Sequence, residues 1–519
     1  MAGNQAGKQD SIEGRDFMPR RPLPLLASLL ALAWMIAGCA ALTSRQIQRD
    51  FHRPVECAEF FSKLDGLIRE AGVRDASMAP VPGFPYLRTN RFLAALGQRI
   101  AGDEQLEQWL DLMRRADLES RRKELMNLPD AEVRMAWGSQ AGDPNRLELM
   151  ERAAACSERL YANDRSSRRF LDHVKARARV PDEYSTGMRI VGLHPLASVP
   201  VALVTQRVRN RVRKWYEGDM DRLPVRGKLW RYVPERMAVP GPDPLEERIR
   251  RASENPLSIP LPVGKEQEEL LRLNAPELMV DVAGPYDRPG TLSRVSGGPR
   301  VDGDDPAVYA YVSHAFLRGK PVLQCNYVVW FPARAGPGSP WIERGSLDGL
   351  TVRISLDFRG KPFMVDIMNN CGCYHLFVPD RHSVAVVLSR FAGLDSFVPQ
   401  WLPDLAENQR LGVRIRSGWH QVERVYAATA REGRESDIPY RLLPYERLES
   451  QPAPDGRHAS MFNDRGIVEG SRRIEPLIFF PMGIPSIGSM RQRGRHAIDL
   501  IGREHFDNPY LFDERFIFR

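Results

Sequence analysis

The sequence is poor in lysine and lacks several common catalytic motifs. Only nine of its 74 basic residues are lysine, and its 66 acidic residues are interspersed among the arginines, so no long basic block indicates a nucleic-acid surface. It has no Gly-x-Ser-x-Gly elbow, no His-Glu-x-x-His motif, no Walker loop and no internal repeat of fixed period. These absences remove the commonest hydrolase and nucleotide-binding classes.

The overall composition is that of a globular protein. The 519 residues are 43% hydrophobic and 27% charged, with a formal net charge of +8. This balance excludes a collagen-like, coiled-coil or wholly disordered chain. The length accommodates two or three domains of roughly 100–200 residues each.

The first 38 residues have the pattern of a secretory signal peptide. Arg20 and Arg21 precede an apolar run over residues 23–37, which small residues close. The run is too short to cross a bilayer, which needs about 20 apolar residues. Because the residues before Met18 are polar and read poorly as a signal sequence, translation is expected to start at Met18.

The end of this run, Ile36-Ala37-Gly38-Cys39, resembles the lipobox of bacterial lipoproteins. The resemblance implies that Cys39 is acylated and becomes the first mature residue, followed by a lipidated tether over residues 39–56. Because Ala40 rather than Asp follows the cysteine, the resemblance also implies that the protein is located at the periplasmic face of the outer membrane. The chain would then contact the membrane through its N-terminal lipid.

Two segments are expected between the tether and the C-terminal region. Residues 57–180 carry hydrophobic residues at helical spacing and are predicted to form a helical domain. Residues 181–263 are predicted to hold an amphipathic helix from Val204 to Tyr216 and then a proline-rich connection. That helix could lie on an anionic membrane, but an ordinary solvated helix is favoured. Pro195 and Pro200 are expected to interrupt any helix before it.

Residues 264–519 are predicted to form a β-rich domain with helices. Apolar and polar residues alternate over 350–358, and turn sequences separate strand pairs over 308–331 and 411–426. Successive hairpins imply a mainly antiparallel sheet. The predicted fold class is therefore α+β, with an N-terminal helical domain, a proline-rich connection and a C-terminal sheet domain.

The cysteines divide into two groups. Cys57 and Cys156 both lie in the predicted helical domain, and a disulfide between them is the simplest interpretation in an oxidising compartment. Cys325, Cys371 and Cys373 remain in the sheet domain. Because their number is odd, at least one of them must be a free thiol, a metal ligand or an intermolecular partner.

The most unusual segment runs from Asn369 to His375 and contains Cys371-Gly372-Cys373-Tyr374-His375. Three interpretations stay open. Cys325 could bridge to Cys371 or Cys373 in a structural role. Alternatively, Cys371, Cys373 and His375 could bind a metal together with His314, and zinc would suit such ligands. Finally, Cys371 or Cys373 could be a nucleophile with His375 as its base.

This segment, together with Tyr309-Ala310-Tyr311-Val312-Ser313-His314 and Asn326-Tyr327-Val328-Val329-Trp330-Phe331-Pro332, resembles a group of uncharacterised proteobacterial proteins. The resemblance implies only that these elements belong to one unit. The expected function is that of a lipid-anchored periplasmic protein that binds or scaffolds, with an envelope protein as its partner and no nucleic acid. The alternative is an envelope enzyme, either a metal-dependent hydrolase or a thiol enzyme.

Overall fold

The computed structural model describes residue 51 and residues 53–138, 145–167, 169–235, 243–295, 297–390, 393–406, 409–429, 437–453 and 456–519. Residues 54–519 form one compact unit. The predicted signal peptide and Cys39 lie outside the described residues, as does nearly all of the predicted tether.

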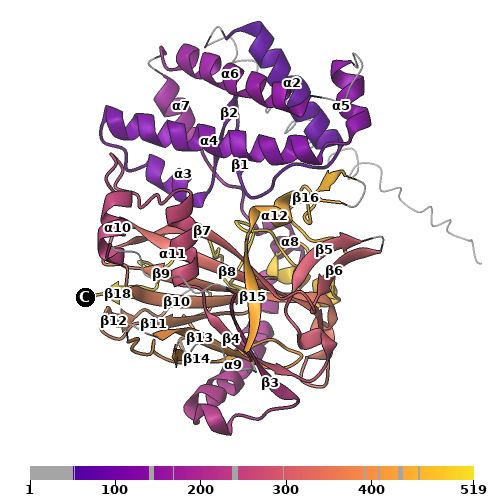
Figure 1. Ribbon diagram of the computed structural model, residues 1–519, viewed down its shortest axis with the longest axis vertical. Coiled ribbons are helices and arrows are strands. Elements are labelled where there is room, and N and C mark those ends of the chain that lie inside the picture. Colours follow the sequence, from indigo (N-terminus) through magenta and orange to yellow (C-terminus); the bar gives the residue numbers. More distant parts are fainter. Residues whose placement is uncertain are drawn as a thin grey trace, which may run out of the picture. The chain divides into compact units, whose positions relative to one another are not determined.

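The N-terminal part of this unit is mainly helical (Figure 1). Its elements are α2 (Val55–Glu70), β1 (Ala79–Val81), β2 (Phe84–Thr89), α3 (Arg91–Gly97), α4 (Asp103–Asn127), α5 (Asp130–Trp137), α6 (Arg146–Asp164) and α7 (Phe170–Arg177). Asn90 and Asn145 cap α3 and α6, because each side chain accepts a hydrogen bond from a backbone N–H of the first turn. The apolar stripe of α4, which includes Trp109 and Met113, is buried.

The predicted disulfide is present in this helical region. Cys57 of α2 and Cys156 of α6 are bonded, with their Cα atoms 5.2 Å apart. Both residues are buried in their helices. The bridge therefore ties together two helices that lie far apart in the sequence.

Helix α8 (Thr186–Val191) and the long helix α9 (His194–Glu217) follow. The expectation that Pro195 and Pro200 interrupt a helix is wrong, because α9 begins before both of them. Pro195 lies in the first turn, where the missing N–H has no partner to lose. Pro200 lies inside the helix on its exposed side, where water can satisfy the freed carbonyl. Within the described residues, no helix combines the length and the hydropathy needed to cross a bilayer.

The largest sheet among the described residues has ten strands, in the order β11-β10-β9-β8-β7-β15-β3-β4-β13-β14. These strands are β3 (Lys228–Pro234), β4 (Glu277–Val282), β7 (Ala307–Leu317), β8 (Lys320–Arg334), β9 (Gly345–Leu356), β10 (Pro362–Asn369), β11 (His375–Pro379), β13 (Gln409–Ile415), β14 (Val422–Thr429) and β15 (Asp437–Pro444). Most pairs are antiparallel, and the α+β class is confirmed. Strand β3 lies inside the predicted proline-rich connection and was not expected.

Smaller elements complete the chain around this sheet. The helices are η1 (Met220–Arg222), α10 (Leu245–Ala252), α11 (Lys265–Leu273), η2 (Pro285–Asp287), η3 (Trp341–Glu343), α12 (Glu446–Glu449), α13 (Glu475–Phe479) and η4 (Phe480–Met482). The strands are β5 (Thr291–Val295), β6 (Gly298–Asp302), β12 (Val384–Val387), β16 (Gln451–Pro452), β17 (His458–Ala459) and β18 (Phe516–Phe518).

Each face of the sheet has its own cover. On one face, side chains of α9, α10 and α11 pack against alternate residues of the strands, including Val308, Cys325 and Ile354. On the other face, α12 and the C-terminal segment pack against the intervening residues, including Tyr309 and Val328. Successive side chains of a strand point to opposite faces of the sheet, so the position of a residue along its strand determines which of the two layers its side chain packs against.

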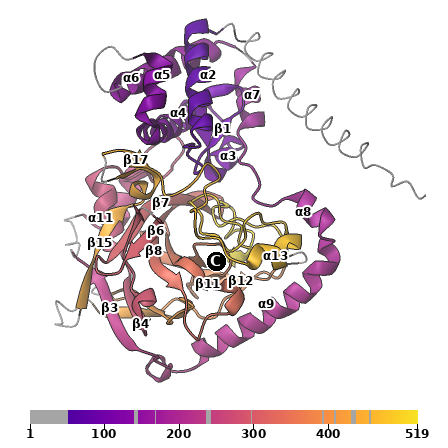
Figure 2. The same ribbon diagram turned by 90° about the vertical axis from the view of Figure 1, so that its right-hand side faces the viewer.

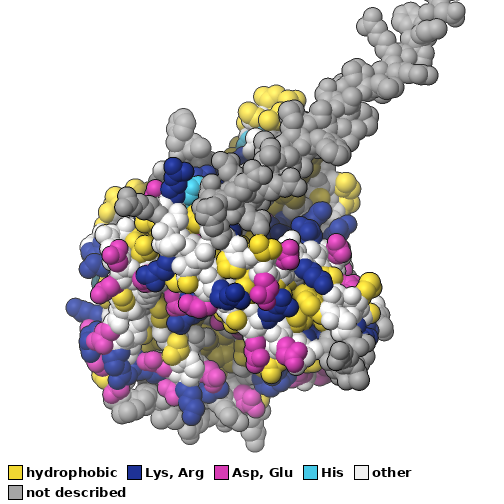
Figure 3. Space-filling model, turned by 90° about the horizontal axis from the view of Figure 1, so that it is seen from above, with side chains coloured by type: hydrophobic (Ala, Val, Ile, Leu, Met, Phe, Trp, Pro, Cys, Tyr) yellow, Lys and Arg dark blue, Asp and Glu magenta, His cyan; other side chains and the backbone are white. Residues whose placement is uncertain are grey.

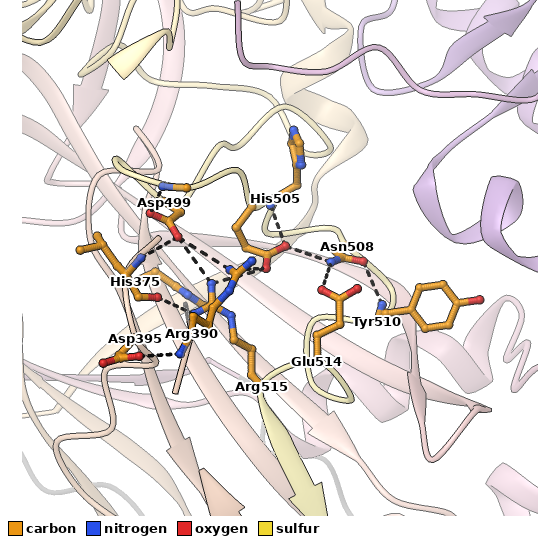
Figure 4. A network of polar contacts seen from close by, with 12 residues as sticks. His375, Arg390, Asp395, Asp499, His505, Asn508, Tyr510, Glu514 and Arg515 are labelled. Atoms are coloured by element: carbon orange, nitrogen blue, oxygen red, sulfur yellow. Dashed lines mark hydrogen bonds and ion pairs between the residues drawn. The ribbon is translucent and has the colours of Figure 1, made fainter. Parts of the chain in front are cut away.

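Ion pairs hold the C-terminal segment in place (Figure 4). Arg390 and Arg515 both reach Glu504, at 3.1 and 3.4 Å, and both face Asp499. Because Asp499 and Glu504 are buried, these two guanidinium groups offset charges that would otherwise be costly.

Candidate functional site

Cys371 and Cys373 lie in the tight turn between β10 and β11 rather than on a strand. Gly372 has a φ of +81°, and its N–H donates to the carbonyl of Asn369 at 2.7 Å. A Cβ at this position would also come within 2.3 Å of the Ala497 carbonyl oxygen. Glycine is therefore required here on two grounds. Strand β11 begins only at His375, so the two cysteines do not share an extended strand with it.

A disulfide between Cys325 and Cys371 or Cys373 is ruled out, because the sheet separates Cys325 from this turn. Cys325 is a free thiol among the residues that α9–α11 cover, whereas Cys371 packs on the opposite face with Val328 and Trp330. Cys371 and Cys373 are also free, and the Cys373 N–H donates to the Cys371 sulfur at 3.4 Å. The turn thus holds two adjacent thiols.

The predicted metal site is also wrong. His314 lies on the face covered by α9–α11, where its Nε2 contacts the Pro260 carbonyl at 2.8 Å and its ring packs on Phe92. His375 faces the opposite side of the sheet, in register with Met368. No group of three or more His, Cys, Asp or Glu residues in the described part of the chain is arranged to hold a metal ion. Strand alternation separates residues that the sequence suggested were neighbours.

His375 pairs with a carboxylate instead of a thiol. Its Nε2 lies 2.8 Å from Asp366, which also forms two hydrogen bonds with Arg353. Burial lowers the pKa of His375, although Asp366 opposes this effect. Among the described contacts, no hydrogen bond links His375 to Cys371 or Cys373, so the base predicted for a thiol nucleophile has another partner.

A buried cluster of charges lies behind the turn. The Arg334 guanidinium forms hydrogen bonds of 2.7 and 2.9 Å with Asp348 and one of 2.6 Å with Glu343. Arg473 reaches the same Asp348 carboxylate at 3.2 Å. Arg473 Nε and one terminal nitrogen have no hydrogen-bond partner among the described residues. Two buried cations therefore stand beside the thiol pair.

His420 belongs to this cluster but is unsuited to act as a base. Its Nδ1 lies 2.8 Å from Asp348, its Nε2 lies 3.1 Å from Asp287, and its ring stacks on Phe331. Burial would lower the pKa of His420, but the two carboxylates outweigh it and raise the pKa above its ordinary value. Both ring nitrogens thus face a carboxylate, so each N–H of the protonated ring has an acceptor.

The pKa values of the two thiols shift in opposite directions. Burial alone would raise the pKa of Cys371, but the Cys373 thiol and the charges of Arg334 and Arg473 lower it to about 7. The hydrogen bond to Cys371 and burial raise the pKa of Cys373 well above its usual value. At neutral pH, Cys371 thus carries much of the thiolate and Cys373 keeps its proton.

Glu475 adds a neutral carboxylic acid to this site. Burial and the nearby Cys371 raise its pKa to about 8, and its Oε2 has no hydrogen-bond partner among the described residues. At neutral pH the group is mostly protonated, so it can donate a hydrogen bond as well as accept one.

A cavity of about 290 Å³ connects these groups to α9. Its walls are mostly hydrophobic and include Val204, Val208 and Val212 of α9 and Leu350, Ile367 and Leu376 of the sheet. Cys373, Tyr374, His375 and Glu475 also line it, together with further polar residues: Thr205, Arg209, Arg211, Glu343, Asn369, Trp419, His420 and Gln421. Cys371 does not line the cavity. The result is a mainly apolar chamber whose wall also holds one thiol, one neutral acid and several charged or amide side chains.

Comparisons with protein families, with curated proteins and with solved structures find no match for the chain. Function is therefore argued from this geometry. The sequence pointed to Cys371, Cys373 and His375 but not to Arg334, Asp348 or Glu475, because nothing in the local pattern distinguishes a buried charge from the many exposed ones.

The low pKa of Cys371 gives a pH prediction. Ultraviolet thiolate absorbance of the native protein should rise as the pH increases through about 7. The step should vanish in Cys371→Ser and should move toward about 8.5, the ordinary thiol value, in Arg473→Met. Cys325→Ser is the matched control, since burial raises the pKa of Cys325 to about 12. A native protein with no step below the ordinary thiol value would contradict the assignment.

Proposed function

We propose that the protein is a lipid-anchored protein of the bacterial cell envelope that binds a small, largely apolar ligand in the cavity under α9. The observation that carries the binding function is the cavity itself, whose surface is mainly hydrophobic with a smaller share of polar side chains. This is the usual construction of a small-molecule site, in which apolar walls supply affinity and polar groups fix orientation. Its volume is near the lower end for such sites, which favours a small ligand.

The polar groups of the wall give the ligand a preferred direction. Glu475 offers a carboxyl that burial and the nearby Cys371 keep largely protonated, and Cys373 offers a thiol that keeps its proton at neutral pH. A ligand with one polar group and an apolar body would satisfy the carboxyl and fill the chamber. A purely charged ligand would instead be costly to bury against the valines of α9.

Thiol–disulfide exchange is a second candidate, favoured by the adjacent thiols and the low pKa of Cys371. The Cys373 thiol, the one of the pair that lines the cavity, would pass its proton to the Cys371 thiolate, attack a substrate disulfide and expel one substrate sulfur as a thiolate. The other cysteine would then attack the mixed disulfide. A Cys371–Cys373 disulfide would form, and the substrate would leave as a dithiol carrying the electron pair and two protons. Loss of this exchange in Cys371→Ser, with ligand binding retained, would separate the two functions.

Ligand binding can be tested with the neutral apolar dye N-phenylnaphthylamine. We expect saturable binding at one site, and we expect Val208→Trp to weaken it by at least about tenfold, because the indole fills the chamber that the dye needs. Val263→Trp is the matched control, since Val263 is exposed and does not line the cavity. Equal binding by both variants, or no saturable binding by the native protein, would contradict the proposal.

A further inference from the structure

An exposed apolar face extends over α8, the first half of α9 and α13. Its exposed members include Ile190, Val191, Leu193, Leu196, Val199 and Leu203 of the first segment and Leu477 and Ile478 of the second. Leu196 is 72% exposed and Leu477 is 79% exposed. Large side chains of this kind are costly to leave in water when they are grouped.

The two segments form one continuous surface although they lie far apart in the sequence. The Ser185 N–H donates to the Gly483 carbonyl at 2.7 Å, and Arg189 Nε donates to the Met482 carbonyl at 2.9 Å. Gly192 also packs closely against Pro481. Figure 2 shows α13 in the angle between α8 and α9. The apolar side chains are thus held on one fixed scaffold.

Before Glu217, the last residue of α9, the charges that α8 and α9 themselves carry are of one sign. No charged residue occurs between Arg189 and Arg207, and no acidic residue occurs between Glu183 and Glu217. Glu475, the acidic residue of α13, is buried, and burial raises its pKa to about 8. By contrast, the face in Figure 3 mixes acidic and basic side chains with scattered hydrophobic ones.

The outward stripe of α9 changes character along its length. Leu196, Val199 and Leu203 occupy its first half, and the exposed Arg207 and Arg211 continue the same stripe at helical spacing. An apolar half followed by a basic half matches the two layers of a membrane surface, because the acyl region lies next to anionic headgroups.

We propose that the face formed by α8, α9 and α13 docks on an anionic lipid surface, with Leu196 and Leu477 among the acyl chains and Arg207 and Arg211 at the headgroups. Charge decides in favour of lipid over a second copy of the chain, because a second copy would bring the same arginines, and the partly exposed carboxylate beside α8, Asp182, already pairs with Arg503. The contact is separate from the lipid predicted at Cys39. It also places Val204, which lines the cavity, next to the acyl chains; this last consequence rests on the proposed function.

The test uses residues 54–519, which form one compact unit with its own hydrophobic core and exclude the N-terminal lipid. We expect this fragment to sediment with vesicles of phosphatidylethanolamine and phosphatidylglycerol but not with phosphatidylcholine vesicles. Leu196→Asp combined with Leu477→Asp should weaken binding by at least about tenfold. Arg207→Gln should weaken it by about fivefold, and salt should weaken the native protein similarly.

The matched control is Met135→Asp combined with Val263→Asp, two residues that are 83% and 73% exposed elsewhere on the molecule. These changes should leave vesicle binding unchanged. Failure of the native fragment to bind, or equal losses in both double variants, would overturn the proposal. A concentration-dependent dimer without vesicle binding would also overturn it, in favour of a second copy. Val208→Trp should weaken binding of the dye and leave vesicle binding unchanged, so the two proposals can fail separately.

Discussion

Replacing Arg334 with methionine is expected to lower the free energy of unfolding by about 3–5 kcal/mol. The side chain is fully buried and neutralises both Asp348 and Glu343. Removal of the guanidinium leaves these carboxylates with too little positive charge nearby, and the hydrocarbon of methionine cannot replace the lost hydrogen bonds. The midpoint of urea-induced unfolding measures this loss.

Arg503→Met is the matched control, because Arg503 pairs with Asp182 at the surface. Exposed ion pairs of this kind contribute little to stability, so the midpoint should stay unchanged within error. An equal midpoint for Arg334→Met and the native protein would show that the buried cluster does not stabilise the fold as the contacts indicate. Because Arg334 also lowers the pKa of Cys371, the variant should show a raised thiol pKa as well.

Loss of the Cys57–Cys156 disulfide is expected to destabilise the protein by about 2–4 kcal/mol. The bond closes a loop with a sequence separation of 99 residues, so its removal restores much conformational freedom to the unfolded chain. Cys57→Ala combined with Cys156→Ala should show this loss in thermal unfolding. In native-state hydrogen exchange, α2 and α6 should open more readily.

Reducing agent supplies the control for this prediction. It should lower the unfolding temperature of the native protein but leave that of the double variant unchanged, because Cys325, Cys371 and Cys373 are already free thiols. A native protein whose stability is insensitive to reduction, or a non-reducing peptide map without the Cys57–Cys156 link, would contradict the structure.

Sequence patterns predicted the local elements well where apolar residues recur at the period of a strand or a helix. The strands expected over 308–317 and 350–358 correspond to β7 and β9, because alternation of apolar and polar residues is visible without knowledge of neighbours. The helices of residues 57–180 were visible for the same reason. Strand β3 was missed, since its surroundings are rich in proline and its pairing partners β15 and β4 are distant in sequence.

The candidate site was predicted only in part, because relative placement depends on register. Alternation along β7 shows which residues share a side with His314, but it does not say which side faces His375 four strands away. The turn at Gly372 decides that question, and it also brings Cys371 and Cys373 together. The buried charges of Arg334 and Asp348 depend on long-range packing that leaves no local signal.

Alkylation by N-cyclohexylmaleimide, followed by peptide mass spectrometry, tests most directly the claim that Cys373 lines a mainly apolar cavity. At neutral pH Cys373 should be modified slowly, because its thiol keeps its proton, whereas the buried Cys325 should not be modified at all, and N-phenylnaphthylamine should protect Cys373. Val208→Trp should slow the modification by at least about tenfold, since it fills the approach to the thiol. Modification of Cys373 at the same rate in the native protein, in the variant and in the presence of dye would contradict the account.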